Sequence, residues 1–176
     1  MARMIAVALM LLFAAPAAAQ RNFAAEFPGR VLAAHNRERA AVGVPPLVWD
    51  NALGTGAAAW AQQLAATNQF EHSDRKARRG IGENLWMGTH GAYSVETMVG
   101  GWVSEKRFFM AGIFPNNSRS GNWIDVGHYS QLIWPTTQRI GCALASNGRT
   151  DYLVCRYATA GNIDGHWVGP GRPERG

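Results

Sequence analysis

Two β-prone runs near the end of this chain each carry one cysteine, and the chain has no other cysteines. The runs, residues 140–145 and 152–157, flank a segment centred on an Asn-Gly dipeptide, which is typical of a hairpin turn. If residues 147–150 form the loop, counting outward places Cys142 opposite Cys155, at the Cβ separation that a disulfide needs. A two-residue loop would miss this register, and two buried thiols are the alternative to a bridge. We therefore expect an antiparallel hairpin closed by a disulfide.

Earlier in the chain, apolar residues recur at helical spacing in three segments, 31–42, 53–64 and 95–109, and residues 83–87 are typical of a strand. The buried positions that we predict are Val31, Ala34, His35 and Val42; Leu53, Ala57, Trp60 and Leu64, behind a cap at Asp50 or Asn51; and Val95, Met98, Trp102 and Phe109, behind a cap at Ser94. Helices come first, one helix lies between strands, and strands do not alternate with helices. This order predicts an α+β fold with a small antiparallel sheet.

The first 19 residues have the pattern of a secretory signal peptide. Arg3 precedes an unbroken apolar run over residues 4–15, and the small residues 17–19 offer a cleavage site before Gln20. The run is 12 residues long, whereas a membrane span needs about 20, so we expect no transmembrane anchor. We expect residues 20–176 to form one secreted domain, extracellular or periplasmic, with a Gly-, Pro- and Arg-rich C-terminal tail.

The chain is mildly basic, with a formal net charge of +5 and one dense cluster at residues 75–79. Such a cluster could face nucleic acid, acidic lipid headgroups or an anionic cell wall. Because no aromatic residue interleaves its charges to stack on bases, we interpret it as a solvated loop. We expect no nucleic-acid partner.

Four polar side chains occupy unusual positions in this pattern. Glu105 continues the apolar stripe of the third helix, where a buried carboxylate needs a partner, although it could instead reach solvent or pair with its basic neighbours. His128 begins a short apolar turn, His72 follows the second helix, and Glu83 begins a strand. Alone, none is a metal signature, since the chain has neither an HExxH helix nor a CxxC pair.

Together, five motifs resemble those of the CAP superfamily, which includes cysteine-rich secretory proteins, insect venom allergens and plant pathogenesis-related proteins. The matching motifs are H-N-x-x-R at residues 35–39, G-E-N-L at 82–85, W-x-x-E at 102–105, G-H-Y-S-Q-L-I-W at 127–134, and Y-x-P-x-G-N at 157–162, where Thr159 replaces the proline. The short Ala-rich leader and the single cysteine pair are more typical of bacterial members than of plant or animal members.

This resemblance implies a three-layer α-β-α sandwich whose central cleft is lined by His72, Glu83, Glu105 and His128. Members of the family bind divalent ions through the two histidines. The resemblance therefore also implies that His72 and His128 ligate Zn²⁺ or another divalent cation, with the glutamates orienting them or acting through water. A metal-free cleft in which the four groups share protons is the alternative.

Two classes of function fit this resemblance. The first is a monomeric secreted binding module that holds a divalent cation and engages a lipid or cell-surface ligand, because an apolar segment lies where eukaryotic relatives contact lipids. Its candidate lipid-contacting residues are Phe108, Phe109, Ile113 and Phe114. The alternative is a secreted hydrolase, either metal-dependent in the same cleft or using Ser130, two residues from His128. The chain has no G-x-S-x-G elbow, and we favour binding over catalysis.

Overall fold

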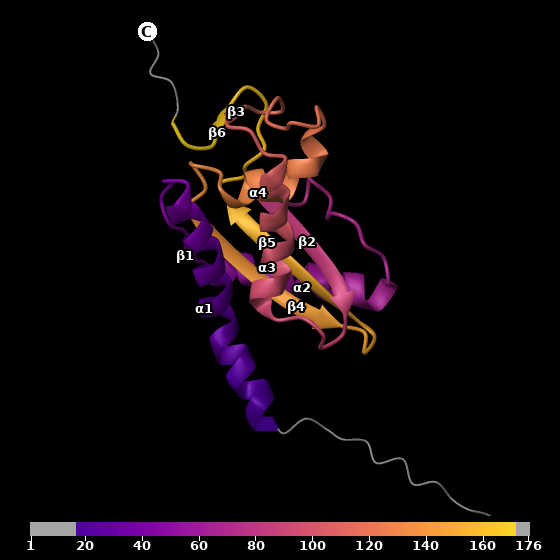
Figure 1. The fold of residues 1–176 in the computed structure, drawn as a ribbon. Coiled ribbons are helices and arrows are strands. Elements are labelled where there is room, and N and C mark those ends of the chain that lie inside the picture. Colours follow the sequence, from indigo (N-terminus) through magenta and orange to yellow (C-terminus); the bar gives the residue numbers. More distant parts are fainter. Residues whose placement is uncertain (1–16, 172–176) are drawn as a thin grey trace, which may run out of the picture.

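A computed structural model describes residues 17–171 of the chain, and the side chains of residues 23–171. The helices are α1 (Ala17–Ala41), α2 (Asn51–Thr67), α3 (Val95–Val103) and α4 (Gly127–Leu132), with short 3₁₀ turns η1 (Ser104–Arg107) and η2 (Trp123–Val126). The strands are β1 (Val48–Trp49), β2 (Ile81–Thr89), β3 (Gly112–Ile113), β4 (Arg139–Ser146), β5 (Thr150–Ala158) and β6 (Trp167–Val168) (Figure 1). The expected signal segment lies outside the described residues, except that residues 17–19 begin α1.

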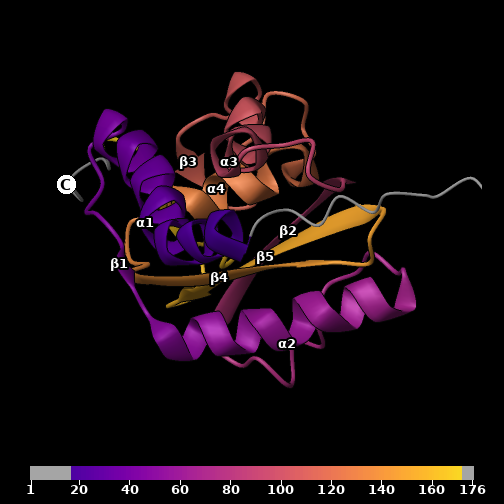
Figure 2. The ribbon, with the colours of Figure 1, turned by 90° about the horizontal axis from the view of Figure 1, so that it is seen from below.

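A four-stranded sheet forms the middle layer of a three-layer sandwich. Its strand order is β1-β4-β5-β2; β4 and β2 run antiparallel to β5, and the two-residue β1 runs parallel to β4. Figure 2 shows α2 covering one face of the sheet while α1, α3 and α4 cover the other. This confirms the predicted α+β sandwich, to which the structure adds a parallel strand too short to show a period in the sequence.

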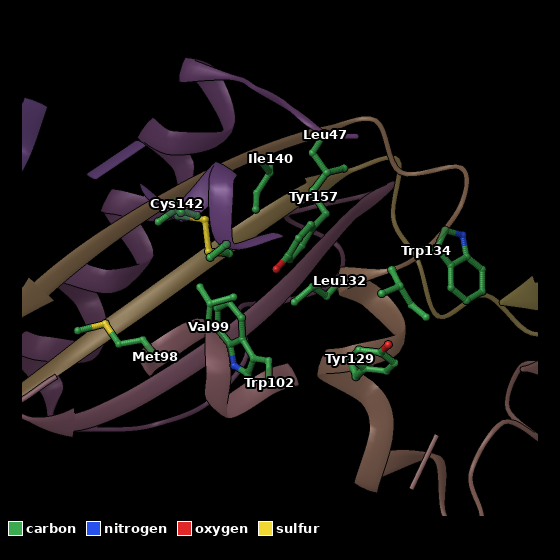
Figure 3. Close-up of a cluster of buried hydrophobic side chains, with 14 of the residues drawn as sticks. Leu47, Met98, Val99, Trp102, Tyr129, Leu132, Trp134, Ile140, Cys142 and Tyr157 are labelled. Atoms are coloured by element: carbon green, nitrogen blue, oxygen red, sulfur yellow. A yellow bond between two sulfur atoms is a disulfide. The ribbon is translucent and has the colours of Figure 1, made fainter. Parts of the chain in front are cut away.

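Strand β5 lies in the middle of the core, because both of its faces are covered. Tyr152 and Val154 pack in a small cluster with residues of α2, whereas Leu153, Cys155 and Tyr157 pack in the larger cluster on the opposite face (Figure 3). The two alternating sets of side chains reflect the period of two in a strand. The sheet therefore separates two apolar clusters and contributes to both.

The hairpin of β4 and β5 has the predicted register. Cys142 lies opposite Cys155, and the two form a disulfide that is visible in Figure 3. In the turn, the Asn147 Oδ1 atom accepts hydrogen bonds from the amides of Arg149 and Thr150, at 3.1 and 2.9 Å. This local hydrogen bonding closes the loop at the length that brings the cysteines together.

Helix α2 begins directly after Asp50, whose Oδ1 atom accepts from the amides of Ala52 and Leu53 at 2.8 and 3.1 Å. Its buried residues are Leu53, Ala57, Ala61 and Leu64. The prediction that Trp60 lies centrally on this face is wrong, since Trp60 is only partly buried and its Nε1 atom donates to the carbonyl of Glu71. Positions three and four residues apart can share one helix face, and the smaller Ala61 occupies the buried one.

The small residues on α2 allow its first turn to lie directly on the sheet. A Cβ atom at Gly141 of β4 would clash with the backbone of Gly54 and Asp50. Only glycine fits at position 141, because the obstructing atoms belong to the backbone and cannot move aside.

Buried polar side chains anchor α1, and they belong to its H-N-x-x-R motif. The Nδ1–H group of His35 donates to the Val31 carbonyl at 2.8 Å, so the neutral ring accepts at Nε2 from the Tyr157 hydroxyl at 2.9 Å. Asn36 exchanges two hydrogen bonds with the backbone of Leu47. These contacts join α1 to the central strand and to the segment before β1.

Arg39 of the same motif is fully buried. Its guanidinium donates to the carbonyls of Pro45, Leu132, Trp134 and Thr137, at distances of 2.7 to 3.0 Å. A planar group with five donors can bind several carbonyl groups at once. Arg39 therefore fixes the segment between α4 and β4 against α1.

Helix α3 begins after the predicted cap Ser94, whose Oγ atom accepts from the Thr97 amide at 3.2 Å. The prediction of one helical stripe as far as Phe109 is wrong, because α3 ends at Val103 and η1 follows. Phe109 is still buried, but it lies beyond this tighter turn. The change of pitch after Val103 places Glu105 in η1, outside the α3 stripe.

The C-terminal segment folds back onto the domain as far as it is described. β6 pairs antiparallel with β3, and Val168 is fully buried. Part of the Gly-, Pro- and Arg-rich C-terminal segment is thus built into the fold. Across residues 17–171, no helix combines the length and the apolar character that a membrane crossing requires.

Candidate functional site

A cavity of about 700 Å³ lies beside β2, the strand at one edge of the sheet. Its lining comes from the loop after α2, the start of β2, the η2–α4 segment and the loop after β5. His72, Glu83 and His128 line it, and Glu105 is hydrogen-bonded to His128. The structure therefore brings three predicted residues to one cavity and places the fourth beside it.

His72 and Glu83 form the first of two histidine–carboxylate pairs. The Nδ1 atom of His72 lies 3.0 Å from Glu83 Oε1, and the amide and hydroxyl of Ser73 donate to the same carboxylate at 2.9 and 2.6 Å. Because a carboxylate can only accept, the His72 hydrogen lies on Nδ1. The Glu83 side chain is fully buried, whereas that of His72 is half exposed.

Several donors surround the buried Glu83 carboxylate. Burial alone raises its pKa, but hydrogen bonds from His72 and Ser73, and the charge of Arg78, together bring that pKa below its ordinary value. Arg156 contributes a second guanidinium, 3.5 Å from Oε2. Glu83 is therefore ionised at neutral pH and is a weak proton acceptor.

His128, in the first turn of α4, and Glu105, in η1, form the second pair. The Nδ1 atom of His128 donates to Glu105 Oε1 at 2.6 Å, and the amides of His128 and Tyr129 donate to Oε2 at 3.0 Å. Glu105 thus caps α4, whose own preceding residue offers no capping side chain. This explains why the carboxylate is not directed to solvent or to Lys106, which instead pairs with Glu38.

The wall between the two pairs is held by Gln131 and Asn84, both buried residues of the quoted motifs. Gln131 accepts from the Gly161 amide at 2.8 Å and lies against Gly82, where any Cβ atom would clash with it. Asn84 donates to the His128 carbonyl at 3.0 Å. These contacts connect β2, α4 and the loop after β5.

Ser130 does not face a histidine. It is fully buried, and its hydroxyl donates to Asn162 Oδ1 at 2.6 Å, with the Gly127 carbonyl oxygen 3.2 Å away. Asn162 in turn donates to the same carbonyl at 2.8 Å. Ser130 therefore holds the loop after β5 against α4.

The donor set of the cleft fits a divalent cation in part. In each pair the carboxylate occupies Nδ1, and among residues 17–171 neither Nε2 atom has a hydrogen-bond partner. This arrangement is typical of metal-ligating histidines, in which the second ring nitrogen donates to a carboxylate. Within the same range, no group of three or more His, Cys, Asp or Glu side chains is placed to hold a metal. Among the described residues, the histidines that line the cavity are His72 and His128, so this part of the chain offers at most two imidazole ligands there.

The basic cluster at 75–79 differs from the expected solvated loop. Arg78 lines the cavity with only 10% of its side chain exposed, and it donates to the carbonyls of Ser73 and Ile81 at 3.3 and 2.8 Å. Arg75 also lines the cavity. A run of charges in the sequence does not show that the loop turns back on itself and directs one guanidinium inward.

The predicted lipid-contacting segment is divided between core and surface. Phe109 and Phe114 are buried, with 9% and 3% exposure, whereas Phe108 and Ile113 are exposed. Trp123, Ile124 and Ile163 are also exposed and line the cavity, although no sequence pattern indicated them. Single apolar residues in irregular segments have no period that would reveal them.

The chain is thus an α-β-α sandwich with a cavity beside the edge strand β2 and two histidines that are each hydrogen-bonded to a carboxylate. The chain belongs to the CAP family, the Cysteine-rich secretory protein family, whose model matches residues 32–157.

Two plant proteins of similar sequence support this assignment, and one solved structure has a similar fold. Pathogenesis-related protein PRMS of Zea mays is 32% identical over 160 residues, covering 89% of this chain and 91% of the maize protein. Pathogenesis-related protein 1C of Nicotiana tabacum is 36% identical over 135 residues, 76% of each chain. Among solved structures, that of NaASP2 with Zn²⁺ has a TM-score of 0.67 at 23% identity, covering 84% of this chain and 86% of that one.

Proposed function

We propose that this chain is a secreted binding module whose cleft holds a divalent cation, such as Zn²⁺, between His72 and His128 and engages a lipid or cell-surface ligand. The observation that carries the proposal is the pairing of both Nδ1 atoms with carboxylates, which leaves both Nε2 atoms available. In this proposal the first 19 residues direct export and are removed before Gln20.

The two glutamates serve here as orienting groups. Each fixes the ring of its histidine and selects the tautomer with the hydrogen on Nδ1, and Glu105 also fixes the first turn of α4. A bound cation would supply positive charge and open coordination positions for a ligand of the cleft. NaASP2, a structural neighbour, was crystallised with Zn²⁺, which is consistent with a cation in this fold.

Binding is better supported than hydrolysis. A serine hydrolase needs a hydroxyl beside a base, and the Ser130 hydroxyl instead donates to Asn162. A metal-dependent hydrolase needs a carboxylate free to accept a proton from water. The Glu83 pKa is lowered, and three hydrogen bonds already occupy the Glu105 oxygens. Neither glutamate is thus placed as a general base.

Calorimetric titration of chelator-stripped protein with zinc tests the proposal. Either His72→Ala or His128→Ala should abolish most binding, because each removes one of two protein ligands. Replacing Glu83 or Glu105 by Gln should weaken zinc binding by about 10- to 100-fold, since the amide orients the imidazole less well. The affinity should also fall in acid, where a protonated imidazole cannot ligate.

His90→Ala is a matched control for these variants. His90 is also a half-exposed histidine whose Nδ1 atom bonds a buried carboxylate, that of Asp151, but it does not line the cavity. Its loss should leave the zinc affinity unchanged. Equal zinc affinity in the parent and in the double His72→Ala, His128→Ala protein would eliminate the cation site and leave a hydrogen-bonded polar cleft.

A further inference from the structure

Strand β2 lies at one edge of the sheet, and alternate residues of its backbone face away from its neighbour β5. In an antiparallel pair, the N–H and C=O groups of successive residues point in turn toward the partner strand and away from it. Cys142 and Cys155 have Cα atoms 4.1 Å apart, the short spacing of a pair that exchanges no backbone hydrogen bonds. The backbone of Cys155 therefore pairs with its other neighbour, Asn84 of β2. Glu83, one residue earlier, thus directs its N–H and C=O groups outward.

Arg78 and Trp102 close this outward edge on either side of Glu83. The Ile81 amide donates to the Arg78 carbonyl at 3.0 Å, and the Ile81 carbonyl accepts from the Arg78 guanidinium at 2.8 Å. The Leu85 carbonyl accepts from the Trp102 indole at 3.0 Å. Both contacts agree with the alternation, and covering an edge in this way prevents uncontrolled pairing with another chain.

Glu83 lies between the two closed positions, and its backbone is exposed to the cavity. The residue lines the cavity with 7% exposure, whereas its side chain has 0%, so the exposed area belongs to the main chain. Among residues 17–171, neither its N–H nor its C=O group has a hydrogen-bond partner. Backbone polar groups that are largely buried are nearly always paired. In the described part of the chain, one donor and one acceptor of a strand edge thus remain available to a ligand.

The charged side chains around this position balance one another. Apart from the two histidines, the lining contains the guanidinium groups of Arg75 and Arg78 and the carboxylates of Glu83 and Asp164. Such a lining does not favour a ligand with a net charge of either sign. A peptide backbone is neutral and carries N–H and C=O groups at the spacing of a strand, so it matches both the charge balance and the two unpaired groups.

We propose that the cavity binds an extended peptide segment of a partner protein, which adds antiparallel to β2 at Glu83. One ligand residue donates its N–H to the Glu83 carbonyl and accepts from the Glu83 N–H, as in a hydrogen-bonded pair of an antiparallel sheet. The proposal rests on the binding function proposed above and names the ligand class, but it does not require the cation.

Strand geometry also predicts where the side chains of the ligand lie. The residue opposite Glu83 directs its side chain to the same face of the sheet, which is the α2 face, because Leu85 of the same alternating set packs in the cluster with α2. The residues before and after it direct their side chains to the opposite face. There η2, directly before α4, contributes Trp123 and Ile124 to the lining, with 36% and 63% exposure. We therefore expect a small polar residue between two apolar ones.

Amide hydrogen exchange, measured by NMR on the chelator-stripped protein, tests this assignment. The probe is acetyl-Leu-Ser-Leu-N-methylamide, added until the chemical shifts stop changing. Exchange of the Glu83 amide should slow at least about tenfold, because its N–H gains an acceptor. Met87 is the matched control: its amide also faces outward on β2 and has no partner among the described residues, but it does not line the cavity. Exchange at Met87 should stay unchanged.

Two N-methylated forms of the peptide separate main-chain pairing from apolar contact. Methylation of the serine nitrogen removes the donor to Glu83 and should weaken binding at least about tenfold, whereas methylation of the last leucine nitrogen, which faces away from β2, should weaken it less than about threefold. Ile124→Ser should also weaken binding, and Ile113→Ser, outside the cavity, should not. Both positions are exposed, so these variants should keep the parent's melting temperature.

Several results overturn the inference. Failure of the peptide to bind at millimolar concentration does so, and so does binding that leaves exchange at Glu83 unchanged or slows Met87 equally. Equal losses from the two N-methylated peptides remove the pairing. Binding that appears only after zinc is added shows a carbonyl–metal contact and also overturns it. Peptide binding with protection of the Glu83 amide, in a protein that fails to bind zinc, supports this inference and defeats only the cation site. Zinc binding without peptide binding does the reverse.

Discussion

The indole of Trp102 lies nearly parallel to the imidazole of His128, with 6.1 Å between the ring centroids and 15° between the planes. The Trp102 Nε1 atom donates to the Leu85 carbonyl of β2 at 3.0 Å, and the ring is buried to 2% exposure. One core residue therefore contacts α4 and β2, the two elements that carry His128 and Glu83. Trp102 thus belongs to the core and also contacts the two elements that position the cleft residues.

Trp102→Ala should destabilise the domain by about 3 to 5 kcal/mol, because it leaves a large cavity and an unpaired carbonyl. Trp60→Ala should cost clearly less, since Trp60 is only partly buried. Urea unfolding of both variants measures the difference. Similar midpoints for the two variants would contradict the burial described here.

Stability should depend on pH through His35. Burial lowers its pKa to about 4, its hydrogen bond to the Val31 carbonyl acts in the opposite direction, and the charge of Arg39 lowers it further. The unfolded chain takes up a proton near pH 6.5 and the folded chain does not, so this contribution is complete above pH 6.5 and is lost as pH falls towards 4. The loss is about 3 kcal/mol.

His35→Gln removes this titrating group and is the control for the pH effect. Unfolding free energies of the parent and of His35→Gln should converge as the pH falls from about 6.5 to about 5. Parallel curves over that window would show that His35 is protonated in the folded domain.

Arg39→Lys should destabilise the domain by about 2 kcal/mol or more. A lysine ammonium has three donors on one atom and cannot reach all four carbonyl groups that Arg39 binds, so buried acceptors lose their partners. Arg37→Lys, at an exposed position two residues away, is the matched control and should change the unfolding free energy by less than about 0.5 kcal/mol. Equal effects would mean that the carbonyl contacts contribute nothing to stability.

Exported protein should begin at Gln20 and contain no alkylatable thiol, which one intact-mass measurement can check. Replacing Cys142 and Cys155 together by Ser should cost about 3 kcal/mol, because the bridge spans a sequence separation of 13 residues. Chemical denaturation of the double variant provides the value. An unprocessed Met1 terminus in exported protein would refute the expected leader.

Local chemistry made much of the fold predictable. The Asn-Gly turn set the register of Cys142 and Cys155, and Ser94 and Asp50 capped their helices as expected. The end of α3 was not predictable from apolar spacing, because Phe109 is buried whether it follows a helix or a tighter turn. Periodicity shows which residues are buried more directly than it shows the path of the backbone between them.

The site was predictable only in part, because several of its contacts are made by the backbone. The quoted family motifs contain Glu83, Glu105 and His128, and the resemblance to the family as a whole implied His72. Nothing in the spacing of these four residues shows which carboxylate meets which histidine. Arg78 escaped notice because its partners are backbone carbonyl groups, which every residue has and no sequence pattern marks. Contacts made by the backbone are therefore the part of this cleft that only the structure shows.

The contact of Gln131 with two glycines has an evolutionary consequence. Gly82 lies in β2, and Gly161 lies 79 residues later, in the loop after β5. A Cβ atom at either position would meet the Gln131 side chain. A side chain at one glycine would displace the Gln131 amide from the other, so we expect single changes at these three positions to be disfavoured. Among diverging descendants of this chain, the three residues should be inherited together, even in lineages that lose the histidines and alter what the cleft binds.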